Sequence, residues 1–138
     1  MLNDRINTCD LLTRKSFPLD STTCFLCNDD EMEDRTHLLF SCSFIQNFWW
    51  NIGFEWNTDL TIHDMISEGK LRYNLPFFMD IVTAGCWSIW NQRNDLIFED
   101  IPCSIFSCKF DFIKTFKLTM LRAKPSLKDG MSSWIDNI

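Results

Sequence analysis

Apolar residues recur at helical intervals along most of the chain. After Ser43, the residues Phe44, Phe48 and Ile52 follow one another at intervals of four, and Gly53 provides a natural stop. The same reasoning predicts helices over residues 6–17, 43–52 and 58–69, from 74–76 to about 98, within 101–124 after Pro102, and within 126–138. Glycine and proline are scarce, with four of each, which also favours helices. The pattern therefore predicts a mainly α-helical protein.

Two of these segments carry enough apolar residues for a buried face to be assigned. The helix ending near residue 98 is apolar around much of its girth and is expected to be central. Its main stripe is formed by Phe78, Ile81, Val82, Gly85, Ile89 and Leu96. In the helix after Pro102, the expected inward face is Phe106, Phe110, Ile113 and Met120, interrupted by Lys117.

Length and charge narrow the range of functions. A chain of 138 residues is the size of one domain, which we divide into a front module with flanking helices (1–56) and a helical region continuing it (57–138). The net charge is −6, and residues 24–102 hold thirteen acids against four bases. Phosphate backbones are bound largely through lysine and arginine, so any binding of RNA or single-stranded DNA is expected to be weak.

The start of the chain and its hydropathy bear on location. Asp4 and Arg5 interrupt the beginning, no apolar leader follows, and no run of eighteen uncharged apolar residues is present. We therefore expect an intracellular protein, nuclear or cytoplasmic, that is not secreted and does not enter a membrane. In a reducing compartment, clustered cysteines indicate metal ligands before disulfides.

Three cysteines and a histidine lie within nineteen residues. Cys24, Cys27, His37 and Cys42 have the spacing Cys-x2-Cys-x9-His-x4-Cys. Two cysteines separated by two residues can turn both sulfurs toward one point, and His37 and Cys42 can complete a tetrahedron. Such a site has no open position, so one Zn²⁺ held there would be structural and not catalytic. Two other interpretations stay open, namely buried thiols without a metal and a disulfide.

The same region resembles a known family. The stretches "RINTCDLLTRKSF" and "TTCFLCNDDEMEDRTHLLFSCSFIQNFWW" are similar to the zinc-binding domain that follows the reverse transcriptase in plant non-LTR (LINE-type) retrotransposons. "WSIWNQRNDLIFED" at 87–100 is similar to the "W-x-I-W-x-x-R-N" segment farther along those polyproteins. The polymerase motif Tyr-x-Asp-Asp is not present, nor is the acidic constellation of a ribonuclease H domain.

The resemblance implies a function and a set of ligands. It assigns Cys24, Cys27, His37 and Cys42 to the metal, and makes this zinc module a small knuckle or short hairpin packed on helices. It implies a non-catalytic domain that assists nucleic-acid binding, with 57–138 leading toward an absent ribonuclease H domain. The alternatives are a zinc-stabilised module that binds a protein partner, and a retroelement remnant without a function. No small-molecule substrate is expected.

Five further residues are candidates for contacts with nucleic acid or a partner. Trp50 and Trp90 could stack on unpaired bases, and Arg93 could stack on Trp90. Lys114 and Lys117 belong to the more basic C-terminal third and could contact phosphates. For the tryptophans, core packing is the competing interpretation, and for the lysines it is a solvated helix face.

Overall fold

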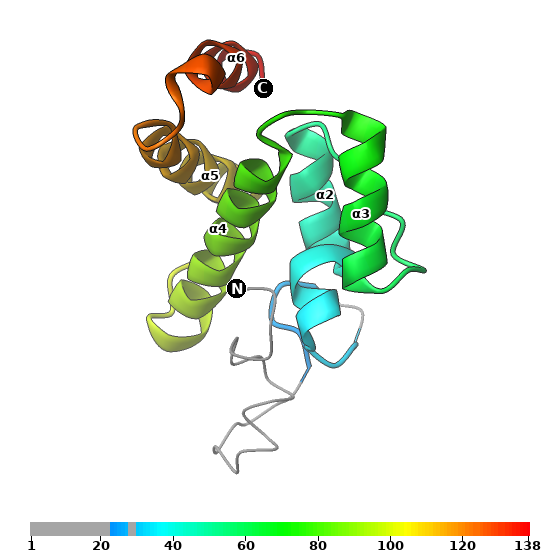
Figure 1. Ribbon diagram of the computed structural model, residues 1–138. Coiled ribbons are helices and arrows are strands. Elements are labelled where there is room, and N and C mark those ends of the chain that lie inside the picture. Colours follow the sequence, from blue (N-terminus) through cyan, green and yellow to red (C-terminus); the bar gives the residue numbers. More distant parts are fainter. Residues whose placement is uncertain (1–22, 28–29) are drawn as a thin grey trace.

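The computed structural model describes residues 23–27 and 30–138, and this part of the chain is mainly helical (Figure 1). Its elements in chain order are a π-helical turn η1 (His37–Ser41) and five α-helices: α2 (Ser43–Asn51), α3 (Ile62–Tyr73), α4 (Phe78–Phe98), α5 (Ile105–Met120) and α6 (Pro125–Asp136). The helix expected over 6–17 lies outside the described residues. The mainly helical fold expected from the apolar periodicity is confirmed.

Helix α4 has the central position that its apolar girth predicts. It packs mainly against α5 and also contacts α3 and η1, while α2 packs against α5 and η1, and α6 against α5. A polar link supports the α4–α5 contact, because the Gln92 amide donates to the Asp111 carboxylate and accepts at 2.8 Å from the Ser107 hydroxyl. No described helix is long and apolar enough to cross a membrane.

Aromatic side chains fill the core between the front turn and the helices. Trp49 is fully buried on α2, and its indole N–H donates to the Leu39 carbonyl at 2.8 Å. Its ring lies 5.3 Å from that of Trp56 and 6.0 Å from that of Phe40, measured between centroids. Gly85 of α4 faces this ring so closely that a Cβ there would lie 2.3 Å from it. The absence of a side chain at residue 85 therefore lets α4 approach α2.

Capping residues explain where the helices begin and end. The Thr61 side chain accepts from the Asp64 N–H, so α3 begins at Ile62 and not near 58–59 as the pattern suggested. It continues past Gly69 to Tyr73, where Asn74 adopts the left-handed conformation (φ 47°) that closes a helix. Pro125 is the first residue of α6, a position that tolerates its missing N–H.

The start of α5 carries a reciprocal cap. Ser104 and Ser107 bond to each other's backbone N–H groups, each at 3.0 Å. The thiols of Cys103 and Cys108 flank this cap with their sulfurs 3.5 Å apart, in the positions of a hydrophobic staple. Local sequence thus fixes the beginning of this helix.

The predicted inward face of α5 is wrong at Phe106 and Phe110, whereas Ile113 and Met120 pack against the core as predicted. Phe106 is 80% exposed and Phe110 is 61% exposed, whereas Cys108, Phe112 and Phe116 are fully buried. Both sets repeat every four residues, so periodicity alone could not choose between them. The buried set is selected because Phe112 and Phe116 meet aromatic partners, including Phe48 of α2 and Trp134 of α6.

Candidate metal centre

A short antiparallel pairing brings the first two cysteines to the site. Thr23 and Met32 form an isolated bridge, and the Cys24 N–H donates to the Glu31 carbonyl at 2.8 Å. The Leu26 N–H points at the Cys24 sulfur, 3.4 Å away, as expected when the backbone turns around a thiolate. This pairing is the short hairpin-like knuckle that the sequence suggested.

The π-helical turn positions the other two donors. The Cys42 N–H donates to the His37 carbonyl at 2.8 Å, which is the i to i+5 bond of a π-helix. In an α-helix, residues five apart lie about 140° apart around the axis. The wider turn brings His37 and Cys42 toward the same side. Asp34 starts the turn by accepting from the His37 N–H at 2.7 Å, and the buried side chains of Leu38 and Phe40 hold it on the core.

The four donor atoms converge on one point. The sulfurs of Cys24, Cys27 and Cys42 and a ring nitrogen of His37 all lie within 4.8 Å of one another. The Cys24 and Cys42 sulfurs are 3.9 Å apart, and the Cys27 sulfur is 3.3 Å from His37 Nε2. A tetrahedral ion at about 2.3 Å from sulfur and 2.0–2.1 Å from nitrogen places such pairs about 3.8 and 3.6 Å apart. The geometry fits one zinc ion, and 3.9 Å is far too long for a disulfide.

The thiols of Cys24 and Cys42 are coupled, so that one of them can carry a negative charge while the other keeps its proton. A hydrogen bond with Cys42 lowers the pKa of Cys24 to about 5, although burial opposes this. The pKa of Cys42 is raised by the same hydrogen bond and by burial. One thiolate thus forms readily beside a protonated thiol, and a dication at the centre would favour ionisation of both.

A carboxylate lies beside the buried Nδ1 of the histidine, a nitrogen that makes no hydrogen bond to the described residues. His37 Nδ1 lies 3.3 Å from Glu31 Oε2, while Nε2 faces the Cys27 sulfur. A metal-binding histidine commonly gives its other ring N–H to a carboxylate, which fixes the tautomer and makes the ligating nitrogen more basic. Glu31 was not singled out in the sequence, where it is one of several acids in a polar loop.

Comparison with known families bears on the same residues. Residues 1–49 match a family model described as zinc-binding in reverse transcriptase. The front of the chain is thus similar to the zinc-binding domains of reverse transcriptases. No curated protein and no solved structure gives a significant match.

All four clustered residues fall inside the matched segment, which covers 49 of the 138 residues. The resemblance drawn from the motifs is therefore confirmed for the front of the chain. A zinc-binding family and a Cys3His cluster that could hold one zinc ion are two independent findings that agree.

A buried ion pair joins the segment that holds the Cys3His cluster to α4. Arg93 is 1% exposed and Glu33 is 0% exposed. The guanidinium Nε lies 3.1 and 3.2 Å from the two carboxylate oxygens, and a terminal nitrogen lies 2.6 Å from Oε1. Glu33 belongs to an acidic run of a composition typical of solvated loops, and its full burial is therefore unexpected. Its carboxylate can be buried because a bidentate arginine partner compensates it.

The remaining candidates occupy different environments. The Arg93 guanidinium lies over the Trp90 ring, 5.0 Å from its centroid, so the expected stacking is present but inside the protein. Trp90 is half-buried beside it. Trp50 is 67% exposed on α2, and Lys114 and Lys117 are exposed on α5. The described structure therefore brings the four metal-site candidates together into one cluster and places Arg93 on Trp90, whereas Trp50, Lys114 and Lys117 lie exposed on their helices.

Proposed function

We propose that Cys24, Cys27, His37 and Cys42 bind one Zn²⁺ and that the ion is structural. The observation that supports this most directly is the convergence of four donor atoms within 4.8 Å of one another. Four protein ligands fill a tetrahedral shell, so no position remains for water or substrate. We accordingly propose a non-catalytic role for this site.

The ion would supply cross-linking energy that the local backbone lacks. The front of the module holds one isolated bridge and a single helical turn among the described residues. Zinc binding in small modules contributes about 10–16 kcal/mol of apparent free energy at neutral pH. Because Leu38 and Phe40 anchor the turn in the core, that energy would also favour the packing of the module on the helices.

We propose that the stabilised module assists the binding of RNA or single-stranded DNA. This follows from the reverse transcriptase association of the matched segment. The net charge of −6 limits the electrostatic contribution, so we expect weak binding that needs low salt.

Titration of the zinc-loaded protein with single-stranded RNA at two salt concentrations tests this role. Affinity should fall with salt with a slope corresponding to one or more phosphate contacts. An absence of binding at low salt would remove the nucleic-acid role and leave the zinc site standing.

Exposed apolar side chains on α5 favour a second function, the binding of a protein partner. Phe106, Phe110 and Leu121 are exposed apolar side chains on α5 and just after it, as is Leu118. Exposed apolar clusters are typical of protein interfaces. Sedimentation analysis of the wild type and of Phe110→Glu tests this alternative in its simplest form, self-association. A concentration-dependent dimer that the substitution abolishes would support it, and a monomer in both cases would count against it.

A further inference from the structure

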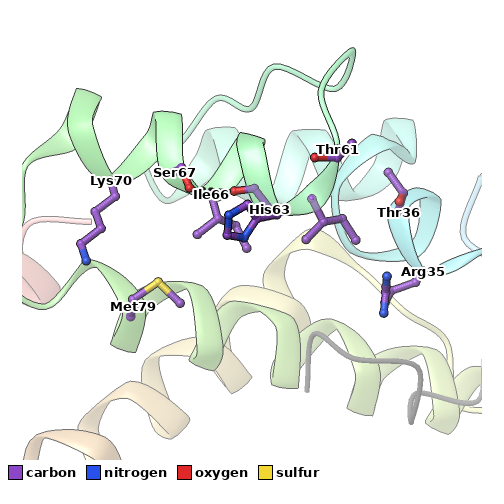
Figure 2. A pocket seen from close by; sticks show the side chains of 9 residues that line it. Arg35, Thr36, Thr61, His63, Ile66, Ser67, Lys70 and Met79 are labelled. Carbon is purple, nitrogen blue, oxygen red and sulfur yellow. Dashed lines mark hydrogen bonds between the residues drawn. The ribbon is translucent and has the colours of Figure 1, made fainter.

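A groove runs between α3, the start of α4 and the residues just before η1 (Figure 2). It has a volume of about 660 Å³. His63 and Lys70 project into it from α3, Met79 comes from α4, and Arg35 lies at the end nearest the zinc module. None of the sequence motifs pointed to this groove, because its lining comes from three separated segments.

The charge of the groove is opposite to that of the chain. Its lining includes three basic side chains, Arg35, His63 and Lys70, and three hydroxyl groups, and none of the described lining residues is acidic. The chain as a whole carries −6, and residues 24–102 hold only four lysines and arginines. Two of those four, Arg35 and Lys70, line this one groove. Acidic residues of α3 are not in the lining, and Glu68 pairs with Arg72 instead.

The spacing of the basic groups indicates an extended anion. His63 and Lys70 are seven residues apart on one helix, which is about 10 Å along its axis. Arg35 enters from a different segment, beyond the α3 start. The groups that bind a single phosphate lie within a few ångströms of one another. Basic side chains spread along the groove therefore suit several successive phosphates better than a single phosphate ion.

Apolar side chains complete the lining. Ile66 lies between His63 and Lys70 on the same face of α3, and Met79 faces it from α4 (Figure 2). A surface of this kind can accept the face of an unpaired base, because stacking and apolar contact need no particular base identity. The hydroxyls of Thr36 and Thr61 can donate to phosphate or sugar oxygens, whereas the Ser67 hydroxyl donates to the His63 carbonyl at 2.9 Å.

We propose that this groove binds two or three nucleotides of a single nucleic-acid strand, with phosphates at Arg35, His63 and Lys70 and a base against Ile66 and Met79. The inference deepens the nucleic-acid role proposed above and rests on it. Arg35 and Thr36 immediately precede His37, so the zinc site would hold one wall of the groove in place.

Nuclear magnetic resonance titration of the full zinc-loaded chain tests the proposal. The probes are an eight-nucleotide oligouridylate and uridine 5′-monophosphate. Amide shifts upon oligonucleotide addition should centre on residues 35–36, 61–70 and 79. The slope of log affinity against log salt should be about 1.4 in magnitude for the two cationic phosphate contacts, Arg35 and Lys70, and fall by about 0.7 in Lys70→Gln. His63→Gln provides a second variant in the same groove.

The matched control is Lys128→Gln, which removes the same charge from an exposed position on α6. At about 50 mM salt, Lys70→Gln should weaken oligonucleotide binding about five- to tenfold, whereas Lys128→Gln should change it less than twofold. Both variants alter exposed side chains, so folding is expected to be retained and is verified by the unperturbed spectrum.

The outcomes separate this proposal from the broader role. Oligonucleotide binding that responds equally to Lys70→Gln and Lys128→Gln, or that depends instead on Lys114 and Lys117, would overturn the groove and leave the nucleic-acid role intact. Equal affinity for the mononucleotide and the oligonucleotide at the groove would make it a site for free nucleotides and overturn the strand. No binding of either probe would remove both proposals.

Discussion

Outside the metal site, the buried pair between Glu33 and Arg93 is a contact whose removal by one substitution should destabilise the protein strongly. Arg93→Met deletes the guanidinium and keeps much of the side-chain volume. It leaves the Glu33 carboxylate, which is 0% exposed, without the partner that contacts both of its oxygens. Removing one member of a buried pair costs about 3–5 kcal/mol, because the remaining charge stays desolvated.

The measurement is urea unfolding of the zinc-loaded protein, followed by circular dichroism. A slope of about 2 kcal/mol per molar urea converts this loss into a midpoint lower by about 1.5–2.5 M. The double variant Glu33→Leu/Arg93→Met should regain most of the stability, since an apolar pair of similar volume replaces a buried ion pair at little cost. The control Arg72→Met, in an exposed pair with Glu68, should change the midpoint far less.

The reasoning fails if Arg93→Met lowers the free energy of unfolding by less than about 1 kcal/mol. It also fails if the double variant is no more stable than Arg93→Met alone. Zinc content is measured for each variant, so that a loss of the metal is not mistaken for a loss of the pair.

Three further predictions follow from packing, thiol environment and the metal. Gly85→Ala should destabilise the fold by about 1–3 kcal/mol in the same urea assay, because the new Cβ would meet the buried ring of Trp49. As a control, Gly130→Ala at an exposed position of α6 should stabilise the fold by about 0.5–1 kcal/mol. Alkylation followed by mass spectrometry should label Cys103 before Cys86. A hydrogen bond with a neighbouring thiol lowers the pKa of Cys103, whereas burial raises the pKa of Cys86 to about 12; the reverse order would contradict the structure. A chelator should expose the three clustered thiols to alkylation and lower the melting temperature, and unchanged protection would argue against metal binding.

The features predictable from sequence are those set by short-range pattern. The helices over α2, α4 and α6 follow from apolar spacing with Gly53 and Pro125 as boundaries, and the Cys-x2-Cys pair with His37 and Cys42 predicts the cluster. In each case, the residues that decide the outcome lie within a few turns of one another. For such features, the chemistry of neighbouring residues is sufficient to predict the structure.

Features decided by distant partners could not be predicted in the same way. Helix α5 has two apolar faces, and only contacts with Phe48 and Trp134 select the one that contains Phe112 and Phe116. Glu33 resembles its solvated neighbours in sequence, and its burial depends on Arg93, sixty residues away. The groove likewise combines three segments whose proximity is set by the packing of α3 on α4.

Metal analysis of the purified native protein tests the central claim most directly. Elemental analysis should find one zinc per chain in the wild type and much less in Cys42→Ser, which removes one of four donors. A folded wild-type chain without zinc, or a Cys42→Ser variant that retains a full equivalent, would contradict a structural Cys3His site.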